Sequence, residues 1–301
     1  MTFDPIELKK LYTPPEDSHK GQNGKLLIIG GSHLFHAASL WALQIASRVV
    51  DMVFYASVPE NNHIVHELKK EFRNGIIVPR EEIENYINEA DAVLIGPGMV
   101  RTELRIREGL GISLKEINSL EDEGEQSYYL TKYLLQRYPE KKWVIDAGAL
   151  QMMEPEWLLQ LHGNAILTPH PVEFERVKAK IKDAKIKQKI ETESMKKQIA
   201  LFAHEFQCVV LLKGQEDVVC SPETCVKIEG GNAGMTKGGT GDVLAGLVAA
   251  LACNNALFLA ATAGAYFNKK AGESLFEKVG YTFNASDLAD EIPVVMRKKL
   301  I

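Results

Sequence analysis

The chain has 301 residues, of which 46% are apolar and 25% are charged, a composition typical of a folded globular protein. Its 35 basic and 40 acidic residues give a net charge of −5, so no global positive field would attract nucleic acid or an anionic membrane. The sequence has neither a run of about 18 apolar residues nor the apolar stretch of a secretory signal peptide at its start. We therefore expect a cytoplasmic protein without nucleic-acid or membrane partners.

Short β-rich runs alternate with helical patterns along the whole chain. Strands are predicted at 25–30, 52–57, 91–96, 142–147, 165–168 and 208–214. Helices are predicted at 37–50, 61–70, 127–138, 173–206 with a break, 241–252, 256–272 and 286–299. Most of the strand segments are continuous apolar runs, which is typical of strands covered on both faces. The alternation predicts an α/β fold, a doubly wound and mostly parallel sheet with helices on both faces, in one domain over residues 1–301.

Two segments are dominated by charge. Residues 101–126 carry many charged side chains and are predicted to form a solvated insertion, which would be either a lid over the site or a loop without a function. Residues 178–197 contain eight lysines, with Ile181, Ile186 and Ile190 between them. This second pattern indicates the exposed face of an amphipathic helix rather than a nucleic-acid-binding surface.

The four cysteines are Cys208, Cys220, Cys225 and Cys253. Cys220 and Cys225 flank the sequence Ser-Pro-Glu-Thr, which predicts a turn. A metal site would need further cysteine or histidine residues close by. We therefore expect all four side chains to be reduced thiols.

A glycine-rich loop stands directly before the apolar helix predicted at 241–252. Gly238, Gly239 and Gly241 lack Cβ atoms, so an anion can approach the unpaired N–H groups at the positive end of this helix. Thr240 can add a hydroxyl donor, and Asp242 falls in the first helical turn beside any bound anion. Backbone amides that hold charge, beside a carboxylate that takes a hydroxyl proton, suit phosphoryl transfer. The alternative is a tight turn in which Asp242 only complements the helix dipole.

The segment NAGMTKGGTGDVLAG (232–246) resembles the signature of the ADP/ATP-dependent NAD(P)H-hydrate dehydratases, a branch of the ribokinase-like superfamily. Further segments match this family in the same order, at 19–32, 95–99, 144–150, 168–177, 211–219 and 284–293. The resemblance implies a ribokinase-like fold and the repair of hydrated NADH or NADPH. In that reaction ADP or ATP, with Mg²⁺, phosphorylates the ring hydroxyl, and phosphate then leaves.

The resemblance also implies roles for individual residues. Asp242 resembles the base that takes the hydroxyl proton, and Gly238, Gly239, Thr240 and Gly241 resemble the anion hole. The residues expected to bind the nucleotide are Lys213, Gly214, Gln215, Glu216, Asp217 and Gly241. Those expected to bind hydrated NAD(P)H are Ala38, Gly98, His170 and Asp242. Glu173 resembles an acid that holds magnesium through water.

Each of these residues also has a purely structural interpretation. Lys213 would then be a solvated lysine at a strand end, His170 a buried, hydrogen-bonded histidine, and Glu173 a glutamate favoured by a helix dipole. Gly98 would belong to a Gly-Pro-Gly backbone turn. The sequence departs from the family pattern at His36, Ala37, Val100 and Asp217, which puts details of the pocket in doubt.

Two other functions fit part of the pattern. One is a ribokinase-like small-molecule kinase of the hydroxyethylthiazole or hydroxymethylpyrimidine type, which would leave the phosphoryl group on its product. The other is a nucleotide-binding regulatory protein without turnover, which the intact Gly-Gly-Thr-Gly-Asp sequence argues against. The family resemblance further implies a homo-oligomer that works with an epimerase, here expected as a separate protein. The preferences for ADP or ATP and for NADH or NADPH hydrate stay open.

Overall fold

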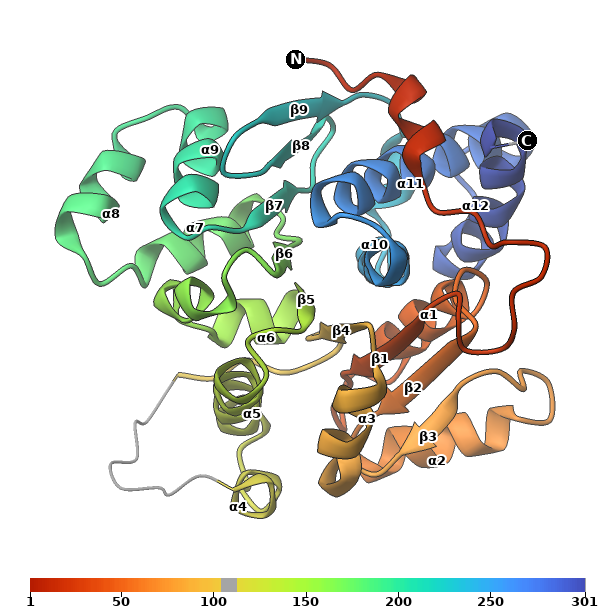
Figure 1. Ribbon diagram of the computed structural model, residues 1–301, viewed down its shortest axis with the longest axis horizontal. Coiled ribbons are helices and arrows are strands. Elements are labelled where there is room, and N and C mark those ends of the chain that lie inside the picture. The colour runs from red at the N-terminus through yellow and green to blue at the C-terminus, as the bar shows by residue number, and fades with distance from the viewer. Residues whose placement is uncertain (104–112, 301) are drawn as a thin grey trace.

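The computed structural model describes residues 1–103 and 113–300, which form a nine-stranded sheet with helices on both faces (Figure 1). The strand order is β3-β2-β1-β4-β5-β6-β7-β8-β9. The strands are β1 (Lys25–Ile29), β2 (Met52–Ala56), β3 (Ile76–Val78), β4 (Ala92–Ile95), β5 (Lys142–Ile145), β6 (Ala165–Leu167), β7 (Val209–Leu212), β8 (Asp217–Cys220) and β9 (Cys225–Ile228). Strands β1 to β7 pair in parallel, whereas β8 and β9 are antiparallel at one edge. The predicted mostly parallel α/β sheet is confirmed.

Strand β1 shows why the central strands are continuous apolar runs. Leu26 and Ile28 point into the apolar layer on one face of the sheet, and Leu27 and Ile29 into the layer on the other face. All four side chains are fully buried. Each strand must therefore be apolar at every position, because helices cover both of its faces.

Helices divide between the two faces of the sheet (Figure 1). One face carries α1 (Ala37–Ala46), α2 (Pro59–Leu68), α10 (Thr240–Asn254), α11 (Leu257–Val279) and α12 (Ala285–Leu300). The other carries α3 (Ile83–Glu89), α4 (Leu114–Asn118), α5 (Glu123–Arg137), α6 (Ala147–Met152), α7 (Pro171–Ala179), α8 (Ala184–Glu191) and α9 (Met195–Glu205). Short 3₁₀ helices lie at Pro5–Lys10, Arg80–Glu82, Pro155–Leu161 and Ala233–Thr236.

Helix α10 is the central helix that its sequence predicts. All residues from 243 to 253 are buried, because α1, α11 and the sheet surround the helix. Gly246 permits the closest approach, since a Cβ there would lie 2.6 Å from the Cα of Ala42. Packing along the whole of α10 therefore fixes the position of its first turn.

The two charged segments are more ordered than their composition predicts. Residues 113–126 of the expected insertion form α4 and the first turn of α5, where Leu114 and Ile117 are buried. Residues 104–112 lie outside the described residues, and the lid interpretation of this segment falls on them. The lysine-rich segment folds into the end of α7, the helix α8 and the start of α9, with most of its lysines exposed.

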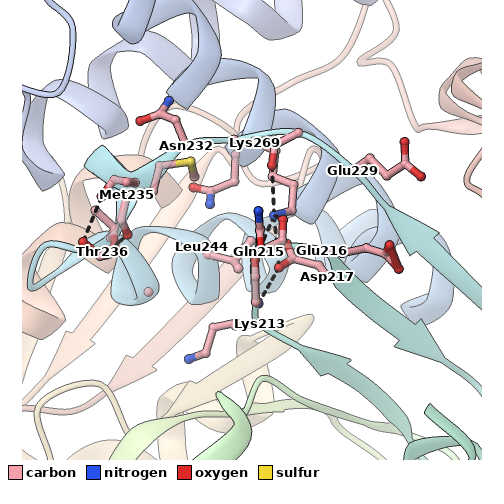
Figure 2. Close-up of a pocket in the computed structure, with 17 residues that line it drawn as sticks. Lys213, Gln215, Glu216, Asp217, Glu229, Asn232, Met235, Thr236, Leu244 and Lys269 are labelled. Atoms are coloured by element: carbon pink, nitrogen blue, oxygen red, sulfur yellow. Dashed lines mark hydrogen bonds and ion pairs between the residues drawn. The ribbon is translucent and has the colours of Figure 1, made fainter. Parts of the chain in front are cut away.

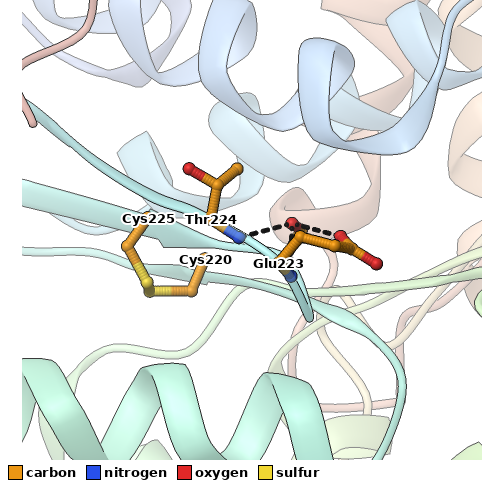
Figure 3. Close-up of a disulfide and its surroundings, with 5 residues drawn as sticks. Cys220, Glu223, Thr224 and Cys225 are labelled. Atoms are coloured by element: carbon orange, nitrogen blue, oxygen red, sulfur yellow. Dashed lines mark hydrogen bonds between the residues drawn. A yellow bond between two sulfur atoms is a disulfide. The ribbon is translucent and has the colours of Figure 1, made fainter.

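The expectation of four reduced thiols is wrong for one pair. Cys220 and Cys225 form a disulfide that joins β8 to β9 (Figure 3). The antiparallel register places these two residues directly opposite each other, on either side of the predicted turn. Cys208 and Cys253 are free, and burial raises the pKa of both thiols. The turn could be predicted from sequence, but the pairing depends on the register of strands that were not predicted.

Within residues 1–103 and 113–300, none of the helices combines the length and the apolar character needed to cross a membrane.

Candidate active site

The predicted site residues gather at the carboxyl ends of the parallel strands. The strand order reverses between β1 and β4, and open α/β sheets bind ligands outside such a reversal. The chain leaves β1 through Gly30 and Gly31, and β4 through Gly96, Pro97 and Gly98. Asp146, Thr168 and Lys213 follow the ends of β5, β6 and β7. Residues far apart in the sequence therefore meet at the carboxyl ends of the central strands.

The glycine loop places free backbone donors at the start of α10. Gly239 precedes the helix with φ of 94°, and a Cβ there would lie 2.3 Å from the Trp41 ring. Only glycine fits this position, since both the backbone angle and the ring exclude a side chain. The N–H groups of Gly238, Gly239 and Gly241 have no acceptor within the described part of the chain. These donors at the positive end of the helix dipole form the geometry expected of an anion hole.

Thr240 has a different role from the one its sequence position predicts. Its hydroxyl lies 2.6 Å from the carbonyl oxygen of Met235 and 2.9 Å from that of Lys237, and the residue is buried. A hydroxyl has one hydrogen to donate. Thr240 therefore donates to the loop and holds its shape, instead of offering its hydroxyl proton to an anion.

Lys213 lies among three acidic side chains. Its Nζ donates to Oδ1 of Asp146 at 3.0 Å and lies 3.8 Å from Oε2 of Glu173. A Cβ on Gly241, the neighbour of Asp242, would lie 3.5 Å from Nζ of Lys213. Burial lowers the pKa of Lys213, but the carboxylates of Asp146, Glu173 and Asp242 outweigh it and raise the pKa. Lys213 is therefore a charged, partly buried ammonium, and not a solvated lysine.

Asp242 is half-buried in the first turn of α10. Burial and the carboxylates of Asp146 and Glu173 raise the pKa of Asp242 to about 7, against the lowering effect of Lys213. A general base works best when its pKa lies near the working pH. Asp242 is thus suited to accept a proton at neutral pH, which a dipole-complementing residue would not require.

His170 and Glu173 are joined at the start of α7. The backbone N–H of His170 donates to Oε2 of Glu173 at 2.9 Å, and the backbone N–H of Glu173 donates to the ring Nδ1 of His170 at 3.3 Å. Gln151 donates to the other oxygen of Glu173 at 3.1 Å. A neutral His170 consequently carries its proton on Nε2. Its side chain is 46% exposed, so the buried alternative is wrong, and its Nε2 lies 3.6 Å from Oε2 of Glu173.

A cavity of about 920 Å³ opens beside the glycine loop (Figure 2). All the residues predicted to bind the nucleotide line it, namely Lys213, Gly214, Gln215, Glu216, Asp217 and Gly241. Thr240 and Leu244 of α10 line it as well, together with the loop from residue 229 to 236. Its size lies within the range of small-molecule sites. The structure therefore brings the predicted nucleotide-binding residues around one cavity.

Asp217 and Lys269 hold the loop that follows β7. The carboxylate of Asp217 is buried, accepts the Gly214 N–H at 2.8 Å and lies 3.4 Å from Nζ of Lys269. Lys269, from α11, donates to the carbonyl oxygens of Gly214 and Gln215 at 3.0 Å (Figure 2). These bonds fix the loop from within. Asp217 thus lines the cavity, with its carboxylate occupied by the protein itself.

Ala38 and Gly98 lie together at the strand-order reversal. A Cβ on Gly98 would be 3.1 Å from the Cβ of Ala38, and Gly98 has φ of 74°. Neither residue, nor His170, lines the 920 Å³ cavity. Asp242 does not line it either, so the four residues predicted for hydrated NAD(P)H all lie outside this cavity.

The acidic side chains of the site could contact magnesium only if the ion entered bound to the phosphates of a nucleotide. Within the described ranges, no cluster of three or more carboxylate, histidine or cysteine side chains is arranged to hold a metal ion. Lys213 already neutralises Asp146, and both oxygens of Glu173 accept hydrogen bonds. A contact of Glu173 with a magnesium ion through its water ligands, which the family resemblance implies, therefore stays a prediction.

Asp146 was not singled out from the sequence, although the segment that contains it was. It is fully buried, and it accepts from Thr168 Oγ1 at 2.8 Å as well as from Lys213. An acidic residue directly after an apolar strand was the available signal. Lys269 gave no such signal, because α11 reaches the cavity only in the folded chain.

The fold is similar to that of solved ribokinase-like proteins. A ribokinase-like superfamily protein of Enterococcus faecalis superposes with a TM-score of 0.77 at 21% identity, over 99% of this chain and 95% of that one. The ADP/ATP-dependent NAD(P)H-hydrate dehydratase of Bacillus subtilis, co-crystallized with ATP/Mg²⁺, gives a TM-score of 0.73 at 21% identity, over 99% and 98% of the chains. The chain thus has a ribokinase-like α/β fold, as predicted.

Sequence comparison identifies the family within this fold. The model of the NAD(P)H-hydrate dehydratase family matches residues 26–294. The ADP-dependent (S)-NAD(P)H-hydrate dehydratase of Nitrosopumilus maritimus is 33% identical over 294 residues, which are 96% of this chain and 95% of that protein. The bifunctional NAD(P)H-hydrate repair enzyme Nnr of Methanocaldococcus jannaschii is 32% identical, and the chain spans 52% of its length. The chain belongs to the NAD(P)H-hydrate dehydratase family.

Proposed function

We propose that this protein is an ADP-dependent (S)-NAD(P)H-hydrate dehydratase, which returns hydrated NADH or NADPH to the reduced dinucleotide. The observation that carries the proposal is Asp242, in the first turn of α10 directly after the glycine loop, whose carboxyl group has a pKa of about 7 and interacts electrostatically with the ammonium of Lys213. The full-length relatives of Nitrosopumilus maritimus and Cenarchaeum symbiosum are named as ADP-dependent, which supports ADP as the donor.

The geometry supports a phosphoryl transfer followed by an elimination. Asp242 takes the proton of the ring hydroxyl, and that oxygen attacks the terminal phosphorus of ADP and displaces AMP. The backbone N–H groups of the glycine loop and Lys213 stabilise the charge on the transferring phosphoryl group. The nitrogen lone pair of the ring then expels phosphate, and the neighbouring carbon loses a proton, which restores the double bond. Bound magnesium would supply further charge neutralisation at the nucleotide phosphates.

His170 and Glu173 would orient the second substrate. The exposed Nε2–H of His170 can donate to the hydrated dinucleotide, while the hydrogen bonds with Glu173 fix the ring. Ala38 and the buried Gly98 lie together at the strand-order reversal, where open α/β sheets bind ligands. We further propose that the protein works beside a separate epimerase, as a homo-oligomer.

The test is a repair assay with purified protein. Hydrated NADH or NADPH is mixed with Mg²⁺ and either ADP or ATP, and the absorbance of the reduced nicotinamide is followed. Recovery that requires the nucleotide and releases one phosphate for each dinucleotide supports the proposal, and the faster donor identifies the preference. A stable phosphorylated product without recovery of the dinucleotide would instead indicate a small-molecule kinase.

A further inference from the structure

The nucleotide cavity contains one buried polar side chain that has no partner. Asn268, in α11, lines the cavity and is 5% exposed. Its Oδ1 is buried without a hydrogen bond, and within residues 1–103 and 113–300 its Nδ2 donates none either. A buried amide without partners is costly, so such groups are rare unless a ligand or water satisfies them.

Three other polar side chains that line the cavity differ from Asn268 in this respect. Asn232 donates to the carbonyl oxygen of Gly272 at 2.7 Å and accepts the N–H of Gly234 at 2.9 Å. Lys269 and Asp217 are occupied by the loop that follows β7, as described above. These side chains maintain the walls of the cavity. Within the described residues, the Asn268 amide makes no such bond.

The position of Asn268 suits the base of a nucleotide. The phosphates would lie at Gly241 and Lys213, beside the amides of the glycine loop. Leu244 follows Gly241 by about one helical turn, and together with Met235 it gives the cavity an apolar wall. An aromatic base packs well against such a wall, whereas its polar edge needs a hydrogen-bonding partner.

We propose that Asn268 recognises adenine and makes the nucleotide site selective for adenine over guanine. A carboxamide presents a donor and an acceptor side by side, which matches the amino group and N7 of adenine. The same edge of guanine presents two acceptors, O6 and N7, and leaves the Asn268 carbonyl unpaired. The inference rests on the proposed function, since it assigns the base specificity of the same nucleotide site.

The test compares the binding of ADP and GDP by calorimetry, without the hydrated dinucleotide. The wild-type protein should bind ADP about 5- to 150-fold more tightly than GDP, the range that corresponds to one bidentate base contact. In Asn268→Leu, a change of similar volume, the affinity for ADP should fall by a factor in this range. The affinity for GDP should change little, so that the ratio of the two approaches one.

Two further variants complete the comparison. Asn268→Asp keeps the side-chain shape but loses the amide donor, and it should also lose affinity for ADP. Asn118→Leu is the matched control, because Asn118 also has a buried Oδ1 without a partner but lies in α4, on the opposite face of the sheet. It should leave both affinities unchanged.

Each outcome bears on a separate claim. Equal binding of ADP and GDP by the wild type, or an unchanged ratio in folded Asn268→Leu and Asn268→Asp, overturns the assignment of Asn268. A protein that shows the expected selectivity but does not repair hydrated dinucleotide contradicts the proposed function and leaves the assignment of Asn268 supported.

Discussion

Replacing Asp242 with asparagine should stabilise the protein while abolishing most of its turnover. Burial and two neighbouring carboxylates raise the pKa of Asp242 from 3.8 to about 7, so its ionised form opposes folding above pH 7. At about 1.4 kcal/mol for each pKa unit, the limit is about 4 kcal/mol. Because Asp242 is only half-buried, solvent screening reduces the expected gain to about 1–2 kcal/mol. Lys213 keeps its bond to Asp146 in the variant.

The sign of the effect depends on pH. A carboxyl group with a raised folded-state pKa destabilises the protein increasingly as the pH rises from 3.8 to about 7. The gain in Asp242→Asn should therefore be complete at pH 8 and should shrink as the pH falls toward 4. Thermal unfolding of the protein without ligands would show an increase in Tm of about 2–4 °C at pH 8. Turnover should fall by about 10²- to 10⁴-fold, with nucleotide binding retained.

A matched control is Asp287→Asn, since Asp287 is also an acidic residue in the first turn of a helix, α12, but is exposed. This variant should gain no stability and keep its turnover. A lower Tm for Asp242→Asn than for wild type at pH 8, or an equal gain at pH 8 and pH 5, would refute the account of Asp242 as a destabilised base.

Other substitutions test the parts of the site separately. Gly239→Ala places a Cβ 2.3 Å from the Trp41 ring at a φ of 94°. It should lower the free energy of unfolding by about 1–3 kcal/mol in chemical unfolding. Gly238→Ala, whose Cβ would meet open space, should be nearly neutral. Lys213→Met should lower turnover at least about 100-fold in the repair assay, because it removes a cation from the transferring phosphoryl group; turnover within a few-fold of wild type would contradict that role. Alkylation of the denatured protein without a reductant should label two cysteines, and labelling of four would show that the disulfide is absent.

The strands that could be predicted are those buried in the sheet. Most of them are short, continuous apolar runs, and the six predictions correspond to β1, β2, β4, β5, β6 and β7. Strand β3 has only three residues, and its first, Ile76, is 42% exposed at the sheet edge. Strand β9 forms the opposite edge, whereas β8, although buried, contains the charged Asp217 and so lacks a continuous apolar run. An edge strand lacks the burial that makes a central strand recognisable.

The candidate site could be predicted where its chemistry lies in a short segment. The glycine loop with Asp242, and the pair of His170 and Glu173, are local patterns of backbone and side chain. Asp146 and Asn268 act through neighbours that are distant in the chain, so only the folded structure shows their contacts. For Thr240 the local pattern predicted the wrong role, because carbonyl groups of the preceding loop orient its hydroxyl.

The pH dependence of kcat/KM for the nucleotide-dependent repair reaction tests the central claim most directly, because it reports the ionisation of the free enzyme. The account predicts that kcat/KM rises with pH through about 7, as Asp242 loses its proton, and that Asp242→Asn is slow and lacks this rise. A wild-type profile that is flat across this range, or an Asp242→Asn variant with the same rise, would contradict the assignment of Asp242 as the base.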